Sequence, residues 1–418
     1  MVEEPIAITG LGVLLPGTSS VDEFWARLAK RESQIGSITR FDAAAEGLPV
    51  CVAGELEDFD YREYLPHLPE RHAEKYSREI LAAVSSSSMA WQDSGLSSIA
   101  TDPRRVSVVQ SSSRGSSEWW LTAQPDSTRY GNAGAMFQGL PSSAASLSAM
   151  AIGARGSAMT VTGACVGGHH ALGVATSELR AGRTDAVIVG GREFPITPEV
   201  MRCFLSLGDG VLTSRRDDPA SAIRPYSIGR DGMALGEGAV AMCLERLSSA
   251  RRRNARVYAR VLSQRAHTDG EHATTMDLTG KQTALLINEA LGAAGISADT
   301  VGYFCGHGTA TQNNDVAECR ALRELYAGDR SIEQLPPIGS NKPIFGHTLG
   351  VAGLVNVAAT ALMFYHQQLA PTANVGSLDP ECNHDHVAEG LRDADLNHAV
   401  SLAFAFGAQT AVVTMGRA

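Results

Sequence analysis

Short apolar runs alternate along this chain with stretches in which apolar residues recur every three or four positions. The apolar runs are typical of buried β-strands, and the longer spacing is typical of helices with one buried face. The expected strands are residues 6–9, 106–109, 186–191, 239–244, 257–262, 301–304, 400–403 and 411–415, and the expected helices are residues 21–30, 77–92, 281–293, 313–325 and 348–362. Because strands and helices alternate, the sequence predicts an α/β fold.

Residues 159–182 join a short apolar run to a helical pattern through a cluster of small residues, and Cys165 stands at the junction. A strand that turns sharply into a helix places the turn residue beside unpaired N–H groups and the positive end of the helix dipole. A cysteine in that position is expected to have a lowered pKa and to react as a thiolate. A small buried cysteine in a tight turn is the alternative.

Composition narrows the classes of protein. The chain has 418 residues, of which 44% are hydrophobic, enough for two or three domains or one large α/β unit. A net charge of −10 argues against nucleic acid as the main partner. The seven cysteines are scattered, odd in number and without a CxxC pair, which favours a reduced intracellular protein. We expect neither a signal peptide nor an uncharged apolar segment of membrane-spanning length, so the prediction is a cytoplasmic protein without membrane association.

Gly10 and Gly12 follow the first expected strand and resemble the beginning of a dinucleotide-binding loop. The third glycine is missing at the required spacing, and Pro16 interrupts the position where the phosphate-binding helix would begin. The sequence therefore argues against a dinucleotide site and predicts a strand that enters a glycine turn.

Two histidines in glycine-flanked turns complete a candidate constellation with Cys165, Lys342 and Glu318. His307 follows the strand at 301–304, and His347 opens the helix at 348–362, where the helix dipole is expected to keep the imidazole neutral. A thiolate and two imidazoles suit acyl transfer through a thioester, in which the imidazoles polarise carbonyls or move protons.

Zinc binding by His307, Asp315 and Glu318 is the rival interpretation. Against it, the sequence has no HxxxH-type pair, and the two carboxylates fit a helix opening better. His169 and His170 are adjacent on one predicted helix, so they point about 100° apart and are interpreted as packing residues.

The order and spacing of these motifs resemble the β-ketoacyl synthase family, the condensing enzymes of fatty acid and polyketide synthesis. The resemblance runs from Ile6 to Met415 and rests on Thr162-Gly163-Ala164-Cys165, Arg230-Asp231-Gly232 with Gly236-Glu237-Gly238, His307-Gly308-Thr309-Ala310-Thr311 with Asn314-Asp315 and Glu318, and Lys342 with Gly346-His347. It implies a thiolase-like α-β-α-β-α layered sandwich of two similar halves, usually dimeric. With the boundary at the basic cluster 251–253, residues 1–251 would carry the nucleophilic cysteine and residues 252–418 the two histidines.

The resemblance also implies catalytic roles. Cys165 would take the acyl chain from an acyl-carrier protein as a thioester. His307 and His347 would act in decarboxylating the malonyl extender and in stabilising its enolate. Lys342 and Glu318 would form a charge pair that supports His307.

Substrate contacts follow from the same resemblance. Thr309 and Thr311 would contact the phosphopantetheine arm, and Phe406 with Gly407 would form a loop that gates access to the thiolate. Backbone N–H groups of Cys165 and Phe406 would form the oxyanion hole. No cofactor and no metal of the enzyme's own are expected, because the phosphopantetheine arm of the carrier protein delivers the substrates. The expected partners are an acyl-carrier protein and a second subunit, either a copy of this chain or a chain-length-factor-like protein.

Several positions depart from the usual pattern of the family. Cys305-Gly306 stands where Glu-Ala is usual, Ala310 replaces a glycine, residues 111–117 are rich in serine, and the loop at 405–410 has alanine at positions 405 and 408. We therefore expect a specialised bacterial type II polyketide or fatty-acid-like pathway. The alternatives are a non-catalytic chain-length-factor-like subunit, against which Cys165 argues, and a cysteine-dependent acyltransferase without decarboxylation.

Overall fold

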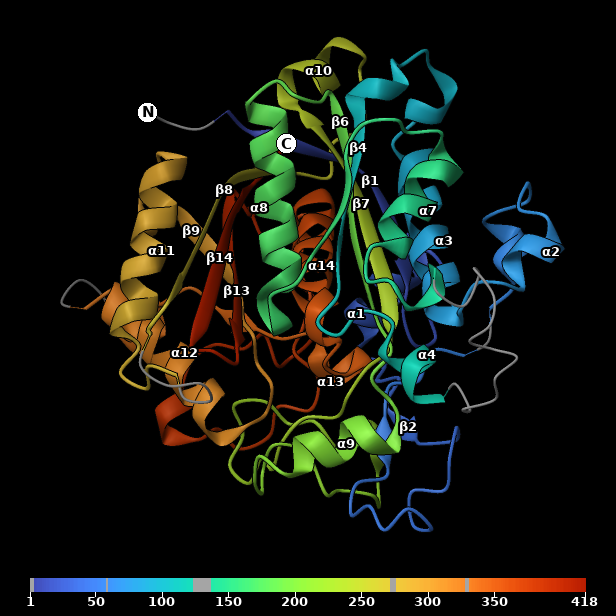
Figure 1. Cartoon of the computed structure of the whole chain (residues 1–418). Coiled ribbons are helices and arrows are strands. Elements are labelled where there is room, and N and C mark those ends of the chain that lie inside the picture. Colours follow the sequence, from blue (N-terminus) through green and yellow to red (C-terminus); the bar gives the residue numbers. More distant parts are fainter. Residues whose placement is uncertain (1–3, 58, 123–136, 271–275, 328–330) are drawn as a thin grey trace.

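Ten strands join in one mixed sheet, in the order β10-β9-β13-β14-β8-β1-β7-β6-β4-β5 (Figure 1). The structure is a computed structural model that describes residues 4–57, 59–122, 137–270, 276–327 and 331–418. The strands of this sheet are β1 (Ile6–Leu14), β4 (Val106–Ser111), β5 (Ala158–Val161), β6 (Ala186–Glu193), β7 (Gly238–Arg246), β8 (Ala259–Thr268), β9 (Val301–Cys305), β10 (Ile338–Gly339), β13 (His398–Ala405) and β14 (Gln409–Gly416). Two small pairs lie outside it, β2 (Gly36–Ser37) with β3 (Val52–Ala53) and β11 (Gln368–Leu369) with β12 (Arg392–Asp393).

Helices cover both faces of the strands. The described helices are α1 (Val21–Lys30), α2 (Glu70–Ala73), α3 (Arg78–Asp93), α4 (Ser117–Thr122), α7 (Ser143–Ile152), α8 (Gly167–Arg180), α9 (Pro198–Leu205), α10 (Leu247–Arg252), α11 (Lys281–Ala294), α12 (Gln312–Leu325), α13 (Lys342–Phe345) and α14 (Ala352–His366). All positions of β1 and β6 are buried, as expected for strands covered on both faces.

The strands fall into two groups that meet edge to edge. β1, β4, β5, β6 and β7 precede residue 251, and the other five strands follow it. The groups join where β1 pairs antiparallel with β8 over three residue pairs, from Ile6–Val261 to Ile8–Ala259. Figure 1 shows α8 and α14 between the two groups, α11 and α12 outside one, and α3 and α7 outside the other. This arrangement confirms the expected α/β layered sandwich.

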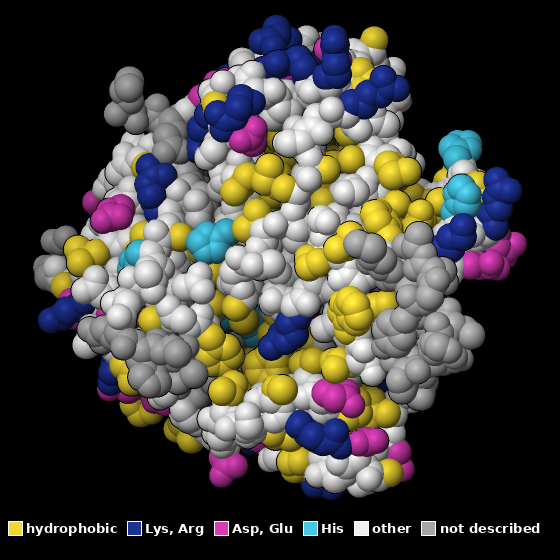
Figure 2. All heavy atoms as spheres, in the orientation of Figure 1, with side chains coloured by type: hydrophobic (Ala, Val, Ile, Leu, Met, Phe, Trp, Pro, Cys, Tyr) yellow, Lys and Arg dark blue, Asp and Glu magenta, His cyan; other side chains and the backbone are white. Residues whose placement is uncertain are grey.

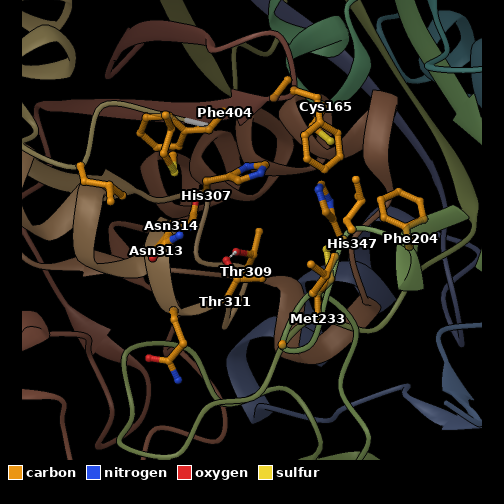
Figure 3. Close-up of a pocket in the computed structure, with 18 of the residues that line it drawn as sticks. Cys165, Phe204, Met233, His307, Thr309, Thr311, Asn313, Asn314, His347 and Phe404 are labelled. Carbon is orange, nitrogen blue, oxygen red and sulfur yellow. Dashed lines mark hydrogen bonds between the residues drawn. The ribbon is translucent and has the colours of Figure 1, made fainter. Parts of the chain in front are cut away.

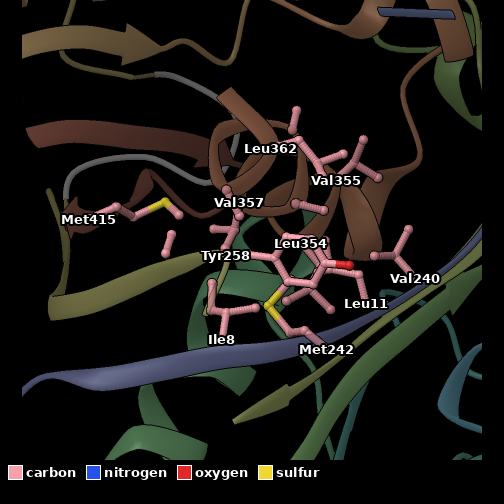
Figure 4. Close-up of a cluster of buried hydrophobic side chains, with 14 of the residues drawn as sticks. Ile8, Leu11, Val240, Met242, Tyr258, Leu354, Val355, Val357, Leu362 and Met415 are labelled. Atoms are coloured by element: carbon pink, nitrogen blue, oxygen red, sulfur yellow. The ribbon is translucent and has the colours of Figure 1, made fainter. Parts of the chain in front are cut away.

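The main hydrophobic core draws side chains from both groups. In Figure 4, Ile8, Leu11 and Met242 of the first group pack with Leu362 of α14 and Met415 of β14. Burial of this shared core holds the two groups in one arrangement, since apolar area removed from water stabilises by about 25 cal/mol per Å². The site described below depends on that arrangement because its residues come from both groups.

Helix α14 corrects one expectation from the sequence. The stretch Leu349–His366 is 18 residues long with a mean hydropathy of 1.5, enough by length and composition to cross a membrane. The expectation that no uncharged apolar segment reaches that length is therefore wrong. Because 89% of this stretch is buried inside the protein, it is typical of a core helix.

Gly10 and Gly12 lie within β1, which continues to Leu14, so the predicted glycine turn does not form. The reason is close packing against α3. A Cβ atom added at Gly10 would lie 2.1 Å from the Ala90 carbonyl oxygen, and one at Gly12 would lie 2.0 Å from that of Ser86. The glycine pattern therefore serves the contact between strand and helix.

Candidate active site

Cys165 lies in a tight turn between β5 and α8. The turn passes through the 3-10 segment Ala164–Val166, and Ala164 has a φ of 45°, in the left-handed region that residues with a Cβ rarely adopt. Cys165 is 8% exposed and precedes the first residue of α8 by two positions. A Cβ at Gly168 would lie 2.9 Å from the backbone nitrogen of Leu354, so this glycine lets α14 approach the cysteine turn.

Burial raises the pKa of the Cys165 thiol to about 12, and the positive charge of Lys342 acts in the opposite direction. The expectation of a lowered thiol pKa is therefore wrong for the resting site. A thiolate surrounded by protein loses its hydration, and this cost exceeds the help from neighbouring positive charge. The cysteine is thus a protonated thiol at neutral pH, and its proton must leave when it attacks a substrate.

His307 follows β9 in a turn that is held from two sides. Glu318 of α12 accepts hydrogen bonds from the backbone N–H groups of His307 and Gly308, at 2.7 and 2.8 Å. Lys342 Nζ donates a hydrogen bond to the carbonyl oxygen of His307. The histidine backbone is therefore fixed by two buried ionisable side chains, which leaves little freedom in the position of the ring.

The side chains of Lys342 and Glu318 form hydrogen bonds to the backbone of His307 and not to each other. Among the described residues, no ion pair joins these two side chains, so the direct charge pair implied by the resemblance does not form. Burial and the neighbouring carboxylate of Asp315 raise the pKa of Glu318 to about 8. Burial lowers the pKa of Lys342, while Glu318 raises it. The two side chains are therefore coupled electrostatically, although no ion pair joins them among the described residues.

His347 lies where the chain turns from α13 toward α14. Its N–H donates to the Ala234 carbonyl at 2.8 Å, and its own carbonyl accepts from Gly236 at 3.0 Å. A 3-10 turn, Leu349–Val351, separates it from α14, which begins at Ala352 and not at residue 348 as expected. The rings of His307 and His347 lie 4.9 Å apart at 86°.

Both imidazoles are neutral. Burial, followed by the charge of Lys342, holds the pKa of each ring well below its ordinary value. A neutral imidazole can accept a proton at one ring nitrogen and donate a hydrogen bond from the other. The expectation of a neutral His347 is met, with burial as the main cause.

One cavity of about 400 Å³ brings the three groups together. In Figure 3, Cys165, His307 and His347 converge on one space, with Phe404 beyond His307 and Phe204 beyond His347. The other lining residues are Leu207, Asp209, Gly210, Val211, Met233, Met276, Leu278, Thr309, Thr311, Gln312, Asn313, Asn314, Ala405 and Phe406. In the view of Figure 2, a hollow bordered by hydrophobic side chains opens on this face, with histidine and basic side chains beside it.

The predicted substrate contacts are distributed unequally around this cavity. Thr309, Thr311 and Phe406 line it, and the hydroxyl oxygens of the two threonines lie 2.8 Å apart. Gly407 is not part of the lining. It has a φ of 84° in the turn between β13 and β14.

Two of the three side chains considered as zinc ligands, Asp315 and Glu318, are engaged in hydrogen bonds to the backbone. Asp315 accepts hydrogen bonds from the backbone N–H groups of Tyr226 and Ala310, and Glu318 is engaged as described above. In the part of the chain that the structure describes, no group of three or more His, Cys, Asp or Glu side chains could hold a metal ion.

His169 packs as expected. Its ring nitrogens lie 3.2 Å from the Ala411 carbonyl oxygen and 3.0 Å from Ser401 Oγ, which links α8 to β14 and β13.

Two family models match the chain. The beta-ketoacyl synthase N-terminal domain covers residues 3–250, and the beta-ketoacyl synthase C-terminal domain covers residues 258–376. The chain belongs to the beta-ketoacyl synthase family. It is therefore a condensing enzyme of the acyltransferase type, with a ketosynthase role in polyketide or fatty acid synthesis.

Similar proteins come from both pathways. The enzyme is 32% identical to the tetracenomycin polyketide synthase ketoacyl synthase alpha subunit of Streptomyces glaucescens, over 99% of this chain and 97% of that protein. It is 30% identical to 3-oxoacyl-[acyl-carrier-protein] synthase 2 of Coxiella burnetii, over 100% and 99% of the two chains.

Two solved structures have the same fold along their whole length. One is described as a type II PKS acyl-carrier protein in complex with its ketosynthase bound to the hexaketide, and the other as the ishigamide ketosynthase/chain length factor. Both superpose with a TM-score of 0.88, cover 100% of both chains, and are 26% and 27% identical to the enzyme.

Sequence reasoning missed Asn356, a buried amide on α14. Its Nδ2 donates to the carbonyl oxygens of Gly306 and Leu402, at 3.1 and 3.2 Å, and its Oδ1 accepts from Asn341 at 2.8 Å. It therefore joins the segments that carry His307, Lys342 and Phe404. The available signal was a single amide side chain within an otherwise apolar, small-residue helix.

Proposed function

We propose that this enzyme catalyses the decarboxylative Claisen condensation of an acyl group on Cys165 with a carrier-bound malonyl group. The observation that carries the proposal is the convergence of Cys165 and two neutral imidazoles, His307 and His347, on one cavity. A thiol supplies a covalent acyl carrier, and neutral imidazoles suit a reaction in which negative charge develops on a carbonyl oxygen.

In the first step, the Cys165 sulfur attacks the carbonyl carbon of an acyl thioester. A new carbon–sulfur bond forms, the bond to the pantetheine sulfur breaks, and the thiol proton leaves with the pantetheine thiol. Because burial keeps Cys165 protonated at rest, one of the neighbouring imidazoles would relay that proton. Backbone N–H groups of Cys165 and Phe406 would stabilise the oxyanion.

In the second step, the bond between the malonyl α-carbon and its carboxylate breaks, and carbon dioxide leaves. The electron pair forms an enolate, whose oxygen would accept hydrogen bonds from His307 and His347. The α-carbon then attacks the acyl carbonyl, the bond to the Cys165 sulfur breaks, and the sulfur takes up one proton from solvent to return to the resting thiol. Lys342 and Glu318, which form hydrogen bonds to the His307 backbone, would act as positioning residues that hold the ring in place.

The substrates would arrive on an acyl-carrier protein, so the enzyme needs no cofactor and no metal of its own. Thr309 and Thr311 place two hydroxyl groups in the cavity wall, where they would contact the phosphopantetheine arm. One similar structure is described as a complex of a ketosynthase with an acyl-carrier protein, which supports this partner.

The enzyme would act as a dimer, either with a second copy or with a chain-length-factor-like subunit. β5 ends the sheet; Ala158 is exposed, and the other three strand residues are half-buried. Met150 on the neighbouring α7 is 72% exposed. A strand edge beside an exposed apolar side chain is typical of an interface. The ketosynthase/chain length factor among the similar structures supports such a pairing.

The pathway would be a specialised bacterial one, of the type II polyketide or a fatty-acid-like kind, in the cytoplasm. Several Streptomyces polyketide ketosynthases are 31–33% identical to this chain along nearly their whole length, which supports this assignment. The departures from the family pattern at Cys305, Gly306, Ala310 and Ala408 support it as well.

The test compares the enzyme with its Cys165→Ala variant. Wild-type protein incubated with acyl-carrier thioesters is expected to gain the mass of one acyl group, and then to release carbon dioxide and a β-ketoacyl product from malonyl carrier. Cys165→Ala should form neither adduct nor product, yet still release carbon dioxide, because the histidines handle the carboxylate.

Cys203→Ala is a suitable control because Cys203 is exposed on α9. An acyl adduct on Cys165→Ala would contradict the assignment of the nucleophile. Acyl transfer without any release of carbon dioxide by the wild type would instead favour the acyltransferase without decarboxylation.

A further inference from the structure

Tyr226 is a fully buried tyrosine beside the His307 turn, and its backbone is held in a strained conformation. Its φ is 63°, in the left-handed region that residues with a Cβ rarely adopt. Its backbone N–H donates to Asp315 Oδ2 at 2.8 Å, and its carbonyl oxygen accepts the N–H of Asp379 at 2.9 Å. Its ring stacks on that of His386, with the ring centres 3.9 Å apart. These contacts on three sides fix the direction of the tyrosine hydroxyl.

Two glycines make room for that hydroxyl. A Cβ atom at Gly306 would lie 2.6 Å from Tyr226 Oη, and one at Gly308 would lie 2.8 Å from it. Gly306 stands where the family usually has alanine, so the phenol oxygen occupies space that a methyl group would need. The departure from the family pattern at residue 306 is therefore matched by the tyrosine at residue 226.

Glu318 lies at the same place. Its Oε2 would be 3.0 Å from a Cβ at Gly306, beside Tyr226 Oη at 2.6 Å. Ser340 Oγ is the other polar atom next to these glycines, and it already donates to the Gly308 carbonyl at 2.9 Å and accepts the Lys342 N–H at 3.2 Å. Tyr226 Oη is buried and completes no hydrogen bond of good geometry among the described residues, which leaves it available to the carboxyl group beside it.

The state of Glu318 decides how firmly the His307 turn is held. Oε2 accepts the N–H of His307 and Oε1 accepts that of Gly308. A carboxylate accepts at both oxygens, whereas a protonated carboxyl group carries a donor on one of them. Burial raises the pKa of Glu318 to about 8, and the hydroxyl of Tyr226 acts in the opposite direction. A donor that favours the carboxylate therefore strengthens the hold on the His307 backbone.

We propose that Tyr226 is a positioning residue for the condensation, because its hydroxyl donates a hydrogen bond to the carboxylate of Glu318, which in turn holds the backbone of His307. Tyr226 is not part of the cavity lining, so it acts through Glu318 and not on the substrate. This inference rests on the function proposed above, since the release of carbon dioxide is the step assigned to the histidines.

The experiment compares the wild type with Tyr226→Phe, which removes the hydroxyl and keeps the stacked ring. The measurement is the rate of carbon dioxide release from malonyl carrier between about pH 6 and 9.5. At neutral pH this rate should fall by about 10-fold, in line with the loss of one hydrogen bond to a charged group. The rise of the rate with pH should also move upward by about one unit, because loss of the donor raises the pKa of Glu318 and leaves less carboxylate at each pH.

Tyr326→Phe is the matched control. Tyr326 is also a buried tyrosine, it follows the helix that carries Glu318, and its hydroxyl donates to the Ala298 carbonyl at 2.8 Å. Its pH profile should coincide with that of the wild type. The other titratable groups around Glu318, which both variants retain, are Asp315 and Cys319 on α12, Tyr303 and Cys305 on β9, and Lys342 on α13.

Gly306→Ala separates the hydrogen bond from the packing. The added methyl group should destabilise the wild type, because it meets Tyr226 Oη, and it should destabilise Tyr226→Phe less, because that oxygen is gone. Chemical denaturation of the wild type, the two single variants and the double variant measures this difference. The double variant should keep the displaced pH profile of Tyr226→Phe, because a methyl group fills the space without donating a hydrogen bond.

An unchanged rate and pH profile in Tyr226→Phe overturns the inference. It is also overturned by an equal displacement in Tyr326→Phe, by a wild-type profile in the double variant, or by stability changes that simply add, since these results would give Tyr226 a packing role only. If the wild type releases no carbon dioxide from malonyl carrier at any pH, the proposed function itself fails and this inference falls with it.

Discussion

Neutral histidines give the cavity its chemical character at the scale of single residues. Burial and the charge of Lys342 depress the pKa of both His307 and His347, so each ring keeps one N–H that can be donated to an oxygen. A protonated imidazole would bind the malonyl carboxylate and stabilise the ground state. A neutral donor interacts more strongly with the enolate than with the thioester carbonyl, and this difference is what lowers the barrier.

We predict that His347→Ala separates the two steps. Acyl loading on Cys165 should persist, because the thiol and its oxyanion donors remain. Release of carbon dioxide from malonyl carrier should fall by about 100-fold or more, as when other oxyanion donors are removed. The measurement is carbon dioxide release in a single turnover, alongside the intact mass of the acylated enzyme.

His398→Ala is the control for this prediction, since its ring lies 2.9 Å from Thr300 Oγ1 and is not part of the cavity lining. Decarboxylation near the wild-type rate in His347→Ala would remove this histidine from the mechanism and favour transfer without decarboxylation.

At the scale of elements, α14 organises the site through one side chain. The amide of Asn356 satisfies two backbone carbonyl oxygens and the Asn341 side chain, all in buried positions. The carbonyls belong to the turn before His307 and to β13, which contains Phe404. Loss of this amide would leave three buried polar groups without their partner.

Asn356→Leu should therefore lower the free energy of unfolding by about 2–4 kcal/mol, since each unsatisfied buried group costs about 1–3 kcal/mol and part of that cost is relieved by relaxation. The check is chemical denaturation, together with the rate of decarboxylation at a temperature where the variant is folded. Thr360→Val serves as a comparison one turn along the same helix, because Thr360 Oγ1 bonds to the Asn356 carbonyl. A smaller loss in Asn356→Leu than in Thr360→Val would contradict the role given to the amide.

Two alanines near the connection between β13 and β14 look equivalent in the sequence alone. The structure separates them. Ala408 has a φ of 51°, in the left-handed region, whereas Ala405 ends β13 without a positive φ. An alanine in the left-handed region costs about 1–2 kcal/mol relative to glycine, whereas a glycine within a strand costs about 0.5–1 kcal/mol relative to alanine.

The two single variants should therefore shift stability in opposite directions. Ala408→Gly should raise the free energy of unfolding by about 1 kcal/mol, and Ala405→Gly should lower it by about half as much or more. Only Ala408→Gly should broaden the range of acyl chains that load Cys165, because relief at position 408 frees the neighbouring Phe406 to move. Melting curves and loading rates with short, long and unsaturated donors test both statements. An equal response of the two variants would mean that the backbone at position 408 does not limit the loop.

Elements and motifs were predictable where they depend on local pattern. The apolar runs located the strands, and the helices at 21–30 and 77–92 form at Val21–Lys30 and Arg78–Asp93. What failed depends on packing between distant segments. Close packing against α3 explains why Gly10 lies in a strand and not in a turn. Burial raises the pKa of Cys165, where a lowered value was expected. Lys342 and Glu318 bond to the backbone of His307 and do not pair directly. No short-range spacing records these contacts.

At the scale of the whole molecule, the site lies where two central helices begin. Cys165 precedes α8 in the first group of strands, and His347 precedes α14 in the second. A Cβ at Gly167 would lie 3.6 Å from the carbonyl oxygen of Gly350, so the two helix entrances are in direct contact. Neither half of the chain carries the complete constellation, and the shared core that joins the halves is therefore also a requirement for the chemistry.

The same burial makes the stability of the whole protein depend on pH. Burial lowers the pKa of His169 to about 4 and of His384 to about 3, and holds His307 and His347 well below their ordinary value. In the unfolded chain each titrates near pH 6.5. Below that pH the unfolded state binds protons that the folded state does not, so each such histidine removes up to about 1.4 kcal/mol of unfolding free energy per pH unit.

Glu318 acts in the opposite sense, because its folded pKa of about 8 exceeds that of the unfolded chain. Between about pH 8 and 4.5 the folded state binds the extra proton, so this residue gains stability as the pH falls. Above about pH 6.5, Glu318 is the only one of these groups whose protonation differs between the folded and unfolded states. Below that pH, the stability lost through the four histidines exceeds the stability gained through Glu318. We therefore predict that the free energy of unfolding is greatest near pH 6.5 and falls steeply toward about pH 5.5.

Denaturation at about pH 8, 6.5 and 5.5 measures this curve, and His384→Gln provides a matched test of its cause. Neither ring nitrogen of His384 has a hydrogen-bond partner among the described residues, and the side chain is 6% exposed. Replacing it should reduce the acid slope by up to about 1.4 kcal/mol per pH unit whatever the variant does to stability at neutral pH. A flat curve between about pH 6.5 and 5.5 in the wild type, or an unchanged slope in His384→Gln, would show that these histidines gain protons without unfolding and that the interior admits water to them.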